Sequence, residues 1–244
     1  AKNYTENLNA NGLNGKHIGI EKAFFDGDSQ IVNIYKAAIE VLKQQGATVV
    51  EIELRKALSD MGNAEFLVLQ YEFKDGVNKY LSTANAKVKT LKDVIDFNKQ
   101  NESTAMPFFK QEILEMCEAK GDLNSSEYKE ALSKTLRTRL IIDDIISDNK
   151  LDAICGVTNG LSWCIDLING DYDTGFSYST PAAMAGYPHI TVPMGIVHDL
   201  PVGLSFIGTA YSEPQIISLA YAYEQATKKR TAPSFIKTSV PEKV

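Results

Sequence analysis

The residue types that most often carry enzyme chemistry are sparse in this sequence and form no recognisable site. The three histidines, His17, His189 and His198, make neither an H-x-x-x-H nor an H-x-x-E-H pair, so zinc hydrolase chemistry is not indicated. His17 and His189 fall in expected strands, where a structural role is favoured. His198 falls in a turn and should be exposed. We therefore assign no metal ligand.

Two aspartate pairs could act as acids, bases or cation ligands. Asp143 and Asp144 should face solvent, because they lie off the apolar stripe of an expected helix. That stripe comprises Leu136, Leu140, Ile141 and Ile145. Asp171 and Asp173 lie in a long loop, where they could orient a substrate amide or bind a cation. Loop aspartates more often accept hydrogen bonds from their own backbone, so both interpretations stay open.

The standard motifs of nucleotide binding and nucleophilic catalysis are absent from the sequence. There is no G-x-G-x-x-G, no Walker loop, no G-x-S-x-G and no Gly-Ser-Ser. The three cysteines include no C-x-x-C pair, and Cys155 lies in an apolar run that predicts a buried, inert thiol. An odd, low cysteine count fits a reducing compartment or a protein that does not depend on disulfides, and we expect a cytoplasmic protein. No cofactor is expected.

The elements that would position any site begin with a strand–helix–strand unit. A short strand over 17–20 is followed by helical spacing over 31–42, which Gly46 ends. Residues 48–54 then alternate, with Val50, Ile52 and Leu54 on one face. This order is the unit of a parallel sheet in an α/β fold.

The middle of the chain is predicted to be helical and to cover the sheet. A long helix over 63–81 has an apolar stripe of Phe66, Leu69, Phe73 and Val77. Further helices are expected over 91–99, from Pro107 to Ala119, and from a cap at Ser125 or Ser126 through Ile146.

The last third alternates strands with turns. A buried strand over 151–156 leads into an irregular loop over 157–178, which is long enough to suggest function. Trp163 and Ile165 argue against disorder there. Pro181 should open a short helix capped by Ser179 or Thr180, and Gly186 should end it. Strands around 190–192 and 202–207 and a helix over 213–228 complete the expected order.

Bulk composition narrows the possible partners. The chain has 244 residues, 44% hydrophobic and 23% charged, with a net charge of −6. The acidic balance disfavours nucleic acid and anionic membranes as partners, since both require clustered Lys and Arg. No apolar run approaches the length of a membrane span, about 18 residues or more.

The stretches LDAICGVTNG, WCIDLINGD, STPAAMAGYP, ITVPMG and DLPVGLSFIG closely resemble the C-terminal part of amidase signature enzymes. Their order and spacing match that family, and the TNG…DLINGD loop is most similar to its peptide-amidase-like branch. Residues before about Ile146 resemble the variable middle segment of the family. The sequence departs from the family pattern at Val157, where proline is usual, and at Leu161 to Cys164.

The resemblance implies a mixed sheet flanked by helices, as in the C-terminal half of the amidase signature α/β/α fold. It implies hydrolysis of a carboxamide by a Ser–cis-Ser–Lys triad, whose motifs precede the matched segment. No catalytic residue is therefore assigned, and the chain alone is expected to be inactive. It would supply part of the substrate pocket, with candidate substrate-binding residues Thr158, Asn159, Trp163, Asp166 and Asp171.

The expected organisation is a single domain or fragment spanning 1–244. It divides into a lead-in (1–15), a variable helical part with the strand–helix–strand start (16–150), a family-specific substrate-side part (151–230) and a tail (231–244). The expected partners are a small amide or peptide amide substrate and the catalytic half, with a homodimer through the open surface as an alternative. Two rival functions remain: a stand-alone ligand-binding domain, and an amidotransferase A-type subunit fragment.

Overall fold

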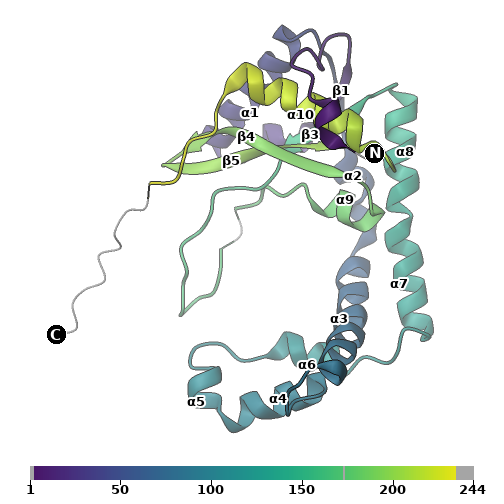
Figure 1. Ribbon diagram of the computed structural model, residues 1–244, viewed down its shortest axis with the longest axis vertical. Helices are drawn as coiled ribbons and strands as arrows, with labels where there is room; N and C mark the ends of the chain where they lie inside the picture. Colours follow the sequence, from purple (N-terminus) through teal and green to yellow (C-terminus); the bar gives the residue numbers. More distant parts are fainter. Residues whose placement is uncertain (1–2, 173, 235–244) are drawn as a thin grey trace, which may run out of the picture.

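A mixed five-stranded sheet organises the chain (Figure 1). The computed structural model describes residues 3–172 and 174–234. In the order β2-β1-β3-β5-β4, β1 pairs in parallel with β2 and β3, whereas β5 is antiparallel to β3 and β4. The strands are β1 (His17–Glu21), β2 (Thr48–Ile52), β3 (Ala153–Val157), β4 (His189–Val197) and β5 (Leu200–Ile207). The expected mixed α/β sheet is confirmed.

The strand–helix–strand start is also confirmed. Helix α1 (Ser29–Gln44) is capped at its N-terminus by Asp28, whose side chain accepts hydrogen bonds from the N–H groups of Gln30 and Ile31. After the helix, Gly46 adopts a φ of +89°, a conformation that glycine reaches without steric cost. The predicted strand over 48–54 is too long, because Leu54 instead opens the short helix α2 (Leu54–Ala57).

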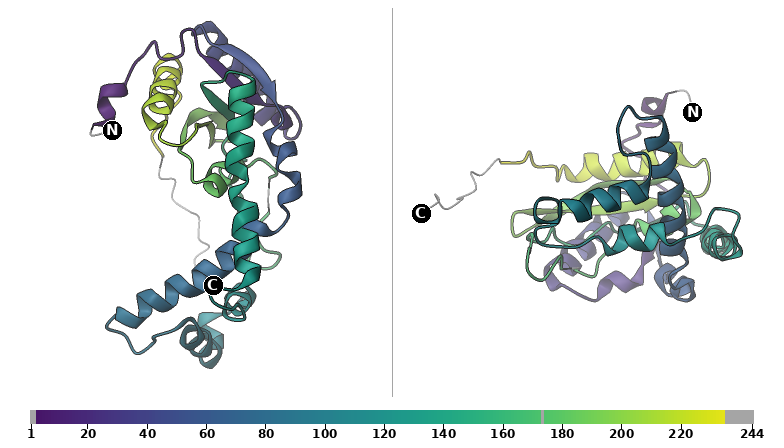
Figure 2. Two further views of the ribbon diagram at one scale, coloured as in Figure 1. Left: turned by 90° about the vertical axis from the view of Figure 1, so that its right-hand side faces the viewer. Right: turned by 90° about the horizontal axis from the view of Figure 1, so that it is seen from below.

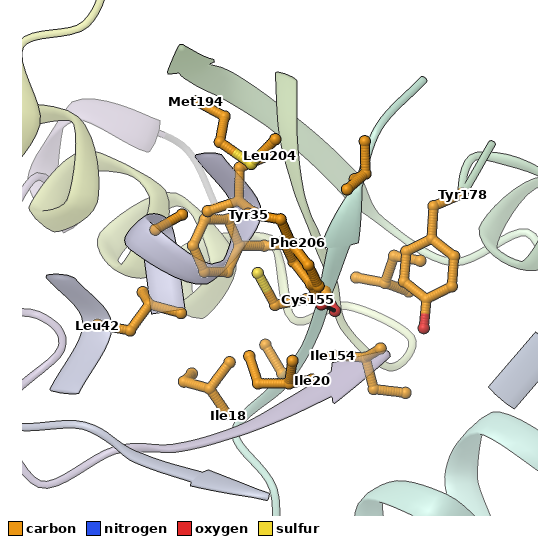
Figure 3. Packing of buried hydrophobic residues seen from close by; sticks show 14 of the residues in the cluster. Ile18, Ile20, Tyr35, Leu42, Ile154, Cys155, Tyr178, Met194, Leu204 and Phe206 are labelled. Atoms are coloured by element: carbon orange, nitrogen blue, oxygen red, sulfur yellow. Dashed lines mark hydrogen bonds between the residues drawn. The ribbon is translucent and has the colours of Figure 1, made fainter. Parts of the chain in front are cut away.

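One face of the sheet is covered by two helices. Helices α1 and α10 (Glu213–Thr227) pack there, and Tyr35, Leu204 and Phe206 surround the fully buried Cys155 (Figure 3). Burial raises the pKa of the Cys155 thiol far above its ordinary value, so the thiol stays protonated. The prediction of a buried cysteine is confirmed.

The segment from residue 179 to 207 folds largely as predicted. Helix α9 (Thr180–Ala185) has Pro181 in its first turn and ends at Gly186, whose φ is +66°. The Ser179 side chain makes no capping hydrogen bond, so that detail of the prediction is wrong. Between β4 and β5, His198 and Asp199 have φ values of 50° and 62°, as a type I′ hairpin turn requires.

The middle helices do not cover the sheet, contrary to the prediction. They form an arm that extends away from it and curves at its far end (Figures 1 and 2). The arm comprises α3 (Ala64–Thr83), α4 (Leu91–Gln100), α5 (Glu102–Ala105), α6 (Glu112–Glu118) and α7 (Ser126–Leu136). Two small clusters separate from the main core hold these helices together, one around Tyr71 and Tyr128 and one around Leu91 and Cys117.

Several predicted details of these helices are wrong. Pro107 lies in a loop before α6, because α6 begins only at Glu112. The predicted helix through Ile146 is two helices: Ser125 caps α7, and α8 (Thr138–Asp148) follows after Arg137. On α8 the fully buried side chain is Ile142, and Ile141 and Ile145 of the expected stripe pack against the core, whereas Leu140 is exposed. Asp143 is half-buried and accepts a hydrogen bond from the Tyr187 hydroxyl at 2.8 Å, so it does not simply face solvent.

The N-terminal segment contributes more than the expected lead-in. It contains the 3-10 helix η1 (Tyr4–Asn7), and Leu13 is fully buried in the main core. Two further 3-10 helices are η2 (Lys22–Phe25) and η3 (Ser59–Met61). Within the residues that the structure describes, no helix combines the length and apolar character needed to span a membrane.

Candidate functional site

The loop over residues 158–179 has a stem that is fixed to the sheet. At its start, the Thr158 N–H donates to the Gly203 carbonyl at 2.9 Å, and the Thr158 carbonyl accepts from the Tyr178 N–H at 3.1 Å. Asn159 forms an isolated bridge with Ser177. Buried Phe176 stacks on Phe24 with ring centroids 5.8 Å apart. The two ends of the loop are therefore held side by side.

The tip of this loop is exposed although it is rich in apolar side chains. Trp163 is 41% exposed, and Ile165 and Ile168 are more exposed still. Asp171 is also exposed, and Asp173 lies outside the described residues. The loop descends from the sheet on the side where the arm lies (Figure 1). Its stem is packed like a core segment, whereas its tip exposes apolar side chains.

Asp166 shapes the tip. Its Oδ1 accepts from the N–H groups of Ile168 and Asn169 at 2.8 and 2.9 Å, and its Oδ2 accepts from Asn169 Nδ2 at 2.9 Å. The N–H of Asn169, with its side-chain amide and the N–H of Ile168, lowers the pKa of the Asp166 carboxyl. The carboxylate therefore closes a local turn, as loop aspartates commonly do.

A chain of hydroxyl groups crosses the sheet beside the stem. His189 Nε2 lies 2.6 Å from Ser205 Oγ, Ser205 Oγ donates to Thr158 Oγ1 at 2.8 Å, and Thr158 Oγ1 lies 2.7 Å from Thr191 Oγ1. Gly203 leaves room for this chain, because a Cβ there would lie 2.5 Å from Thr191 Oγ1. Thr158 thus belongs both to the loop stem and to the polar face of the sheet.

Ser205 and His189 have the geometry of a nucleophile and a base but not the accessibility. Ser205 is fully buried, and its hydroxyl hydrogen is directed to Thr158. With that hydrogen committed, His189 must donate its Nε2–H to Ser205 rather than accept from it. Burial lowers the pKa of His189, which favours this neutral donor. The pair is a positioning contact, consistent with the structural role expected of His189.

Glu21 anchors the other end of the loop and was missed by sequence reasoning. It is buried at the end of β1, where Oε1 accepts from the Ala23 N–H and Oε2 accepts from the Arg55 N–H, both at 3.1 Å. Tyr178 lies on the side of β3 opposite Tyr35 (Figure 3), and its hydroxyl also donates to Glu21 Oε2. Burial, followed by the Glu21 charge, raises the pKa of Tyr178.

The five predicted site residues fall on one loop but are not brought to a single point. Thr158 and Asn159 lie in the stem, and Trp163, Asp166 and Asp171 lie in the tip. Within the described residues, no group of three or more His, Cys, Asp or Glu is placed to hold a metal ion. The arrangement exposes a flat apolar side chain at Trp163 and a carboxylate at Asp171, and the hydroxyl of Thr158 helps to fix the stem.

Known proteins share sequence and fold with this chain. The family model described as Amidase matches residues 1–217. A probable amidase of Arabidopsis thaliana is 33% identical over 243 residues, which are 96% of this chain and 42% of the relative. The A-type chain of the glutamyl-tRNA(Gln) amidotransferase of Clostridium botulinum is 28% identical over 241 residues, which are 93% of this chain and 48% of the relative.

The native peptide amidase of Stenotrophomonas maltophilia superposes with a TM-score of 0.86 at 36% identity, covering 96% of this chain and 47% of that enzyme. This chain therefore spans about half the length of the proteins it matches. Both sequence and structure place it with the peptide-amidase-like branch.

Proposed function

The chain belongs to the amidase family, and from that premise we propose that it supplies the substrate side of an enzyme hydrolysing a carboxamide C–N bond. The observation that carries the proposal is the 158–179 loop, whose stem is pinned to the sheet while its apolar and acidic tip is exposed. A rigidly held stem lets the tip meet a ligand in one orientation, and this is how loops on fixed scaffolds bind substrates.

The chemistry itself is assigned to the rest of the enzyme. By resemblance to amidase signature enzymes, a serine attacks the amide carbonyl, a bridging serine and a lysine relay the protons, and backbone N–H groups stabilise the oxyanion. We place these groups in the part of the peptide amidase that this chain does not match, here called the complementary part. The chain on its own is then inactive.

The loop residues have separate roles in this proposal. Trp163 offers a flat apolar surface for the side chain or ring of the substrate. Asp171 accepts a hydrogen bond from an amide N–H or pairs with a cationic group. Asp166 holds the turn that presents both, and Thr158 and Asn159 fix the stem where it leaves β3.

The complementary part has a place to join the sheet. Within the described residues, β4 pairs only with β5, so its other edge has unpaired backbone groups. An exposed edge strand can pair with another chain, and β4 has nine residues, with a bulge between Pro193 and Gly195. We propose that a strand of the complementary part adds there, and a second copy of this chain is the competing occupant.

Two alternative functions are compared with the proposed one. An amidotransferase A-type subunit would share the same loop, and the 28% identity to a protein of that kind keeps it as the second candidate. A stand-alone binding domain would use the loop tip without turnover.

The decisive experiment mixes this chain with the complementary part from Stenotrophomonas maltophilia and measures ammonia release from peptide amides. We expect release only from the mixture. Release from glutamine in preference to peptide amides would favour the amidotransferase alternative. A fluorophosphonate probe should label the complementary part and not this chain. Labelling of Ser205 in the chain alone would overturn the proposal that the nucleophile lies elsewhere.

A further inference from the structure

Helix α3 carries large apolar side chains that belong to no core cluster within the described residues and remain exposed. Tyr71 and Val68 point to α7, and Lys74 and Val77 point to α6 and α4. The remaining face is formed by Phe66, Leu69, Phe73 and Tyr80, all exposed. We call these four residues the α3 stripe. Their spacing places them on one side of the helix over about 21 Å.

The arm cannot cover this stripe by itself. The cluster around Tyr71 lies on another face of α3. Val77, which borders the stripe, packs against the cluster around Leu91 and Cys117, so the arm covers only the border of the stripe. At one edge the stripe adjoins α6, where Gln70 Nε2 lies 3.9 Å from the sulfur of the exposed Met116. Contiguous apolar surface of this kind on a protein marks a site of association.

We propose that the α3 stripe is a docking surface for the complementary part of the amidase, a deduction that rests on the proposed function. Two observations select this occupant. First, the structural match to the peptide amidase covers 96% of this chain, so it includes the arm and not only the sheet. Second, that enzyme has slightly more than half of its length outside the match, enough chain to cover the arm as well as the sheet edge.

This surface is distinct from the edge of β4. The stripe lies on the arm, whereas β4 lies in the sheet at the other end of the molecule (Figure 1). Docking at both would hold the complementary part between two sites and would orient it relative to the 158–179 loop. The stripe contributes side-chain contacts, and the strand edge contributes backbone hydrogen bonds.

The test compares two leucines of similar exposure on helices. Leu69 in the stripe is 55% exposed, and Leu140 on α8 is 64% exposed. Each is changed to glutamine, which keeps the helix propensity and removes the apolar surface. Far-UV circular dichroism melting of each variant should match the unchanged chain, because neither side chain belongs to a core cluster. Binding to the complementary part from Stenotrophomonas maltophilia is then measured by titration calorimetry.

We expect Leu69→Gln to weaken binding at least tenfold and Leu140→Gln to leave it within twofold. Equal binding by both variants would overturn the stripe as a docking surface and leave the proposed function intact. Failure of the unchanged chain to bind would overturn the proposed function and the docking site with it. Sedimentation that shows a dimer of the chain alone, lost in Leu69→Gln, would assign the stripe to a second copy and overturn the proposal.

Discussion

The hydroxyl of Tyr178 donates a hydrogen bond to Glu21 Oε2 at 3.0 Å, joining residues 157 positions apart in the sequence. Among the described residues, the Glu21 carboxylate accepts hydrogen bonds from three donors, the Tyr178 hydroxyl and the N–H groups of Ala23 and Arg55. The contact ties the end of the 158–179 loop to β1 and to the start of α2. One buried carboxylate thus holds the end of the loop, η2 and α2 in fixed positions relative to β1.

Replacing Glu21 by glutamine should destabilise the protein. Glutamine puts an NH2 group in place of one carboxylate oxygen, so a donor then faces a donor and that hydrogen bond is lost. A buried group left without its partner costs about 1–3 kcal/mol, and we expect a loss of unfolding free energy in that range. Urea denaturation measures it. Glu51→Gln on the exposed side of β2 is the control and should change stability by less than about 0.5 kcal/mol. Equal effects would contradict this account of Glu21.

Stability should depend on His189 in mildly acidic solution. Burial lowers the pKa of His189 below its ordinary value of 6.5, so the folded protein binds the proton less readily than the unfolded chain. Stability that is full above pH 6.5 therefore falls as the pH drops, by at most about 1.4 kcal/mol per pH unit. Thermal melts between pH 7 and pH 5 should show this decline. His189→Gln should flatten it, and an unchanged slope would show that another group is responsible.

Gly76→Ala should stabilise the arm. Gly76 lies inside α3, and a Cβ added there would meet no atom within 4 Å. Alanine in a helix interior is more favourable than glycine by about 1 kcal/mol, so amide exchange in α3 should slow. Gly186→Ala is the contrasting change, because its φ of +66° strains any residue with a Cβ. That variant should melt at a lower temperature, whereas a lower melting temperature for Gly76→Ala would contradict the open environment at that position.

Trp163→Ala should separate binding from folding. The side chain lies outside the core clusters, so the unfolding free energy should change by less than about 0.5 kcal/mol. In the mixture with the complementary part, KM for a peptide amide should rise several-fold. Tyr211→Ala, an exposed aromatic far along the chain, should change neither quantity. An unchanged KM for Trp163→Ala would show that this residue does not contact the substrate.

Sequence reasoning worked where local pattern and burial agree. The unit from β1 to β2 and the segment from α9 to β5 have glycines and alternating residues whose local conformations determine the element order. The prediction that α3 covers the sheet was wrong, because helical spacing shows that an apolar stripe exists but not whether another element covers that stripe. Leu69 belongs to a stripe that was assigned to the core and is exposed.

The candidate site was found only in part for a similar reason. A long irregular loop with Trp163 and aspartates is visible in the sequence, and the structure places those residues on its tip. The contacts that hold the loop are long-range, and Glu21 belongs to no local motif. The hairpin alternation of Ile190, Val192, Leu204 and Phe206 did contain the signal for His189 and Ser205, since it places them together on the other face of the sheet.

The arm leaves the main body after α2 and returns at α8, and these two helices are in contact. The residues between them therefore begin and end at nearly the same place, and their hydrophobic clusters are their own. Changes confined to the far helices α4 to α6 should therefore leave the strand register and the loop stem in place. In topological terms, the arm is a single excursion of the chain that is closed at its base by α2 and α8.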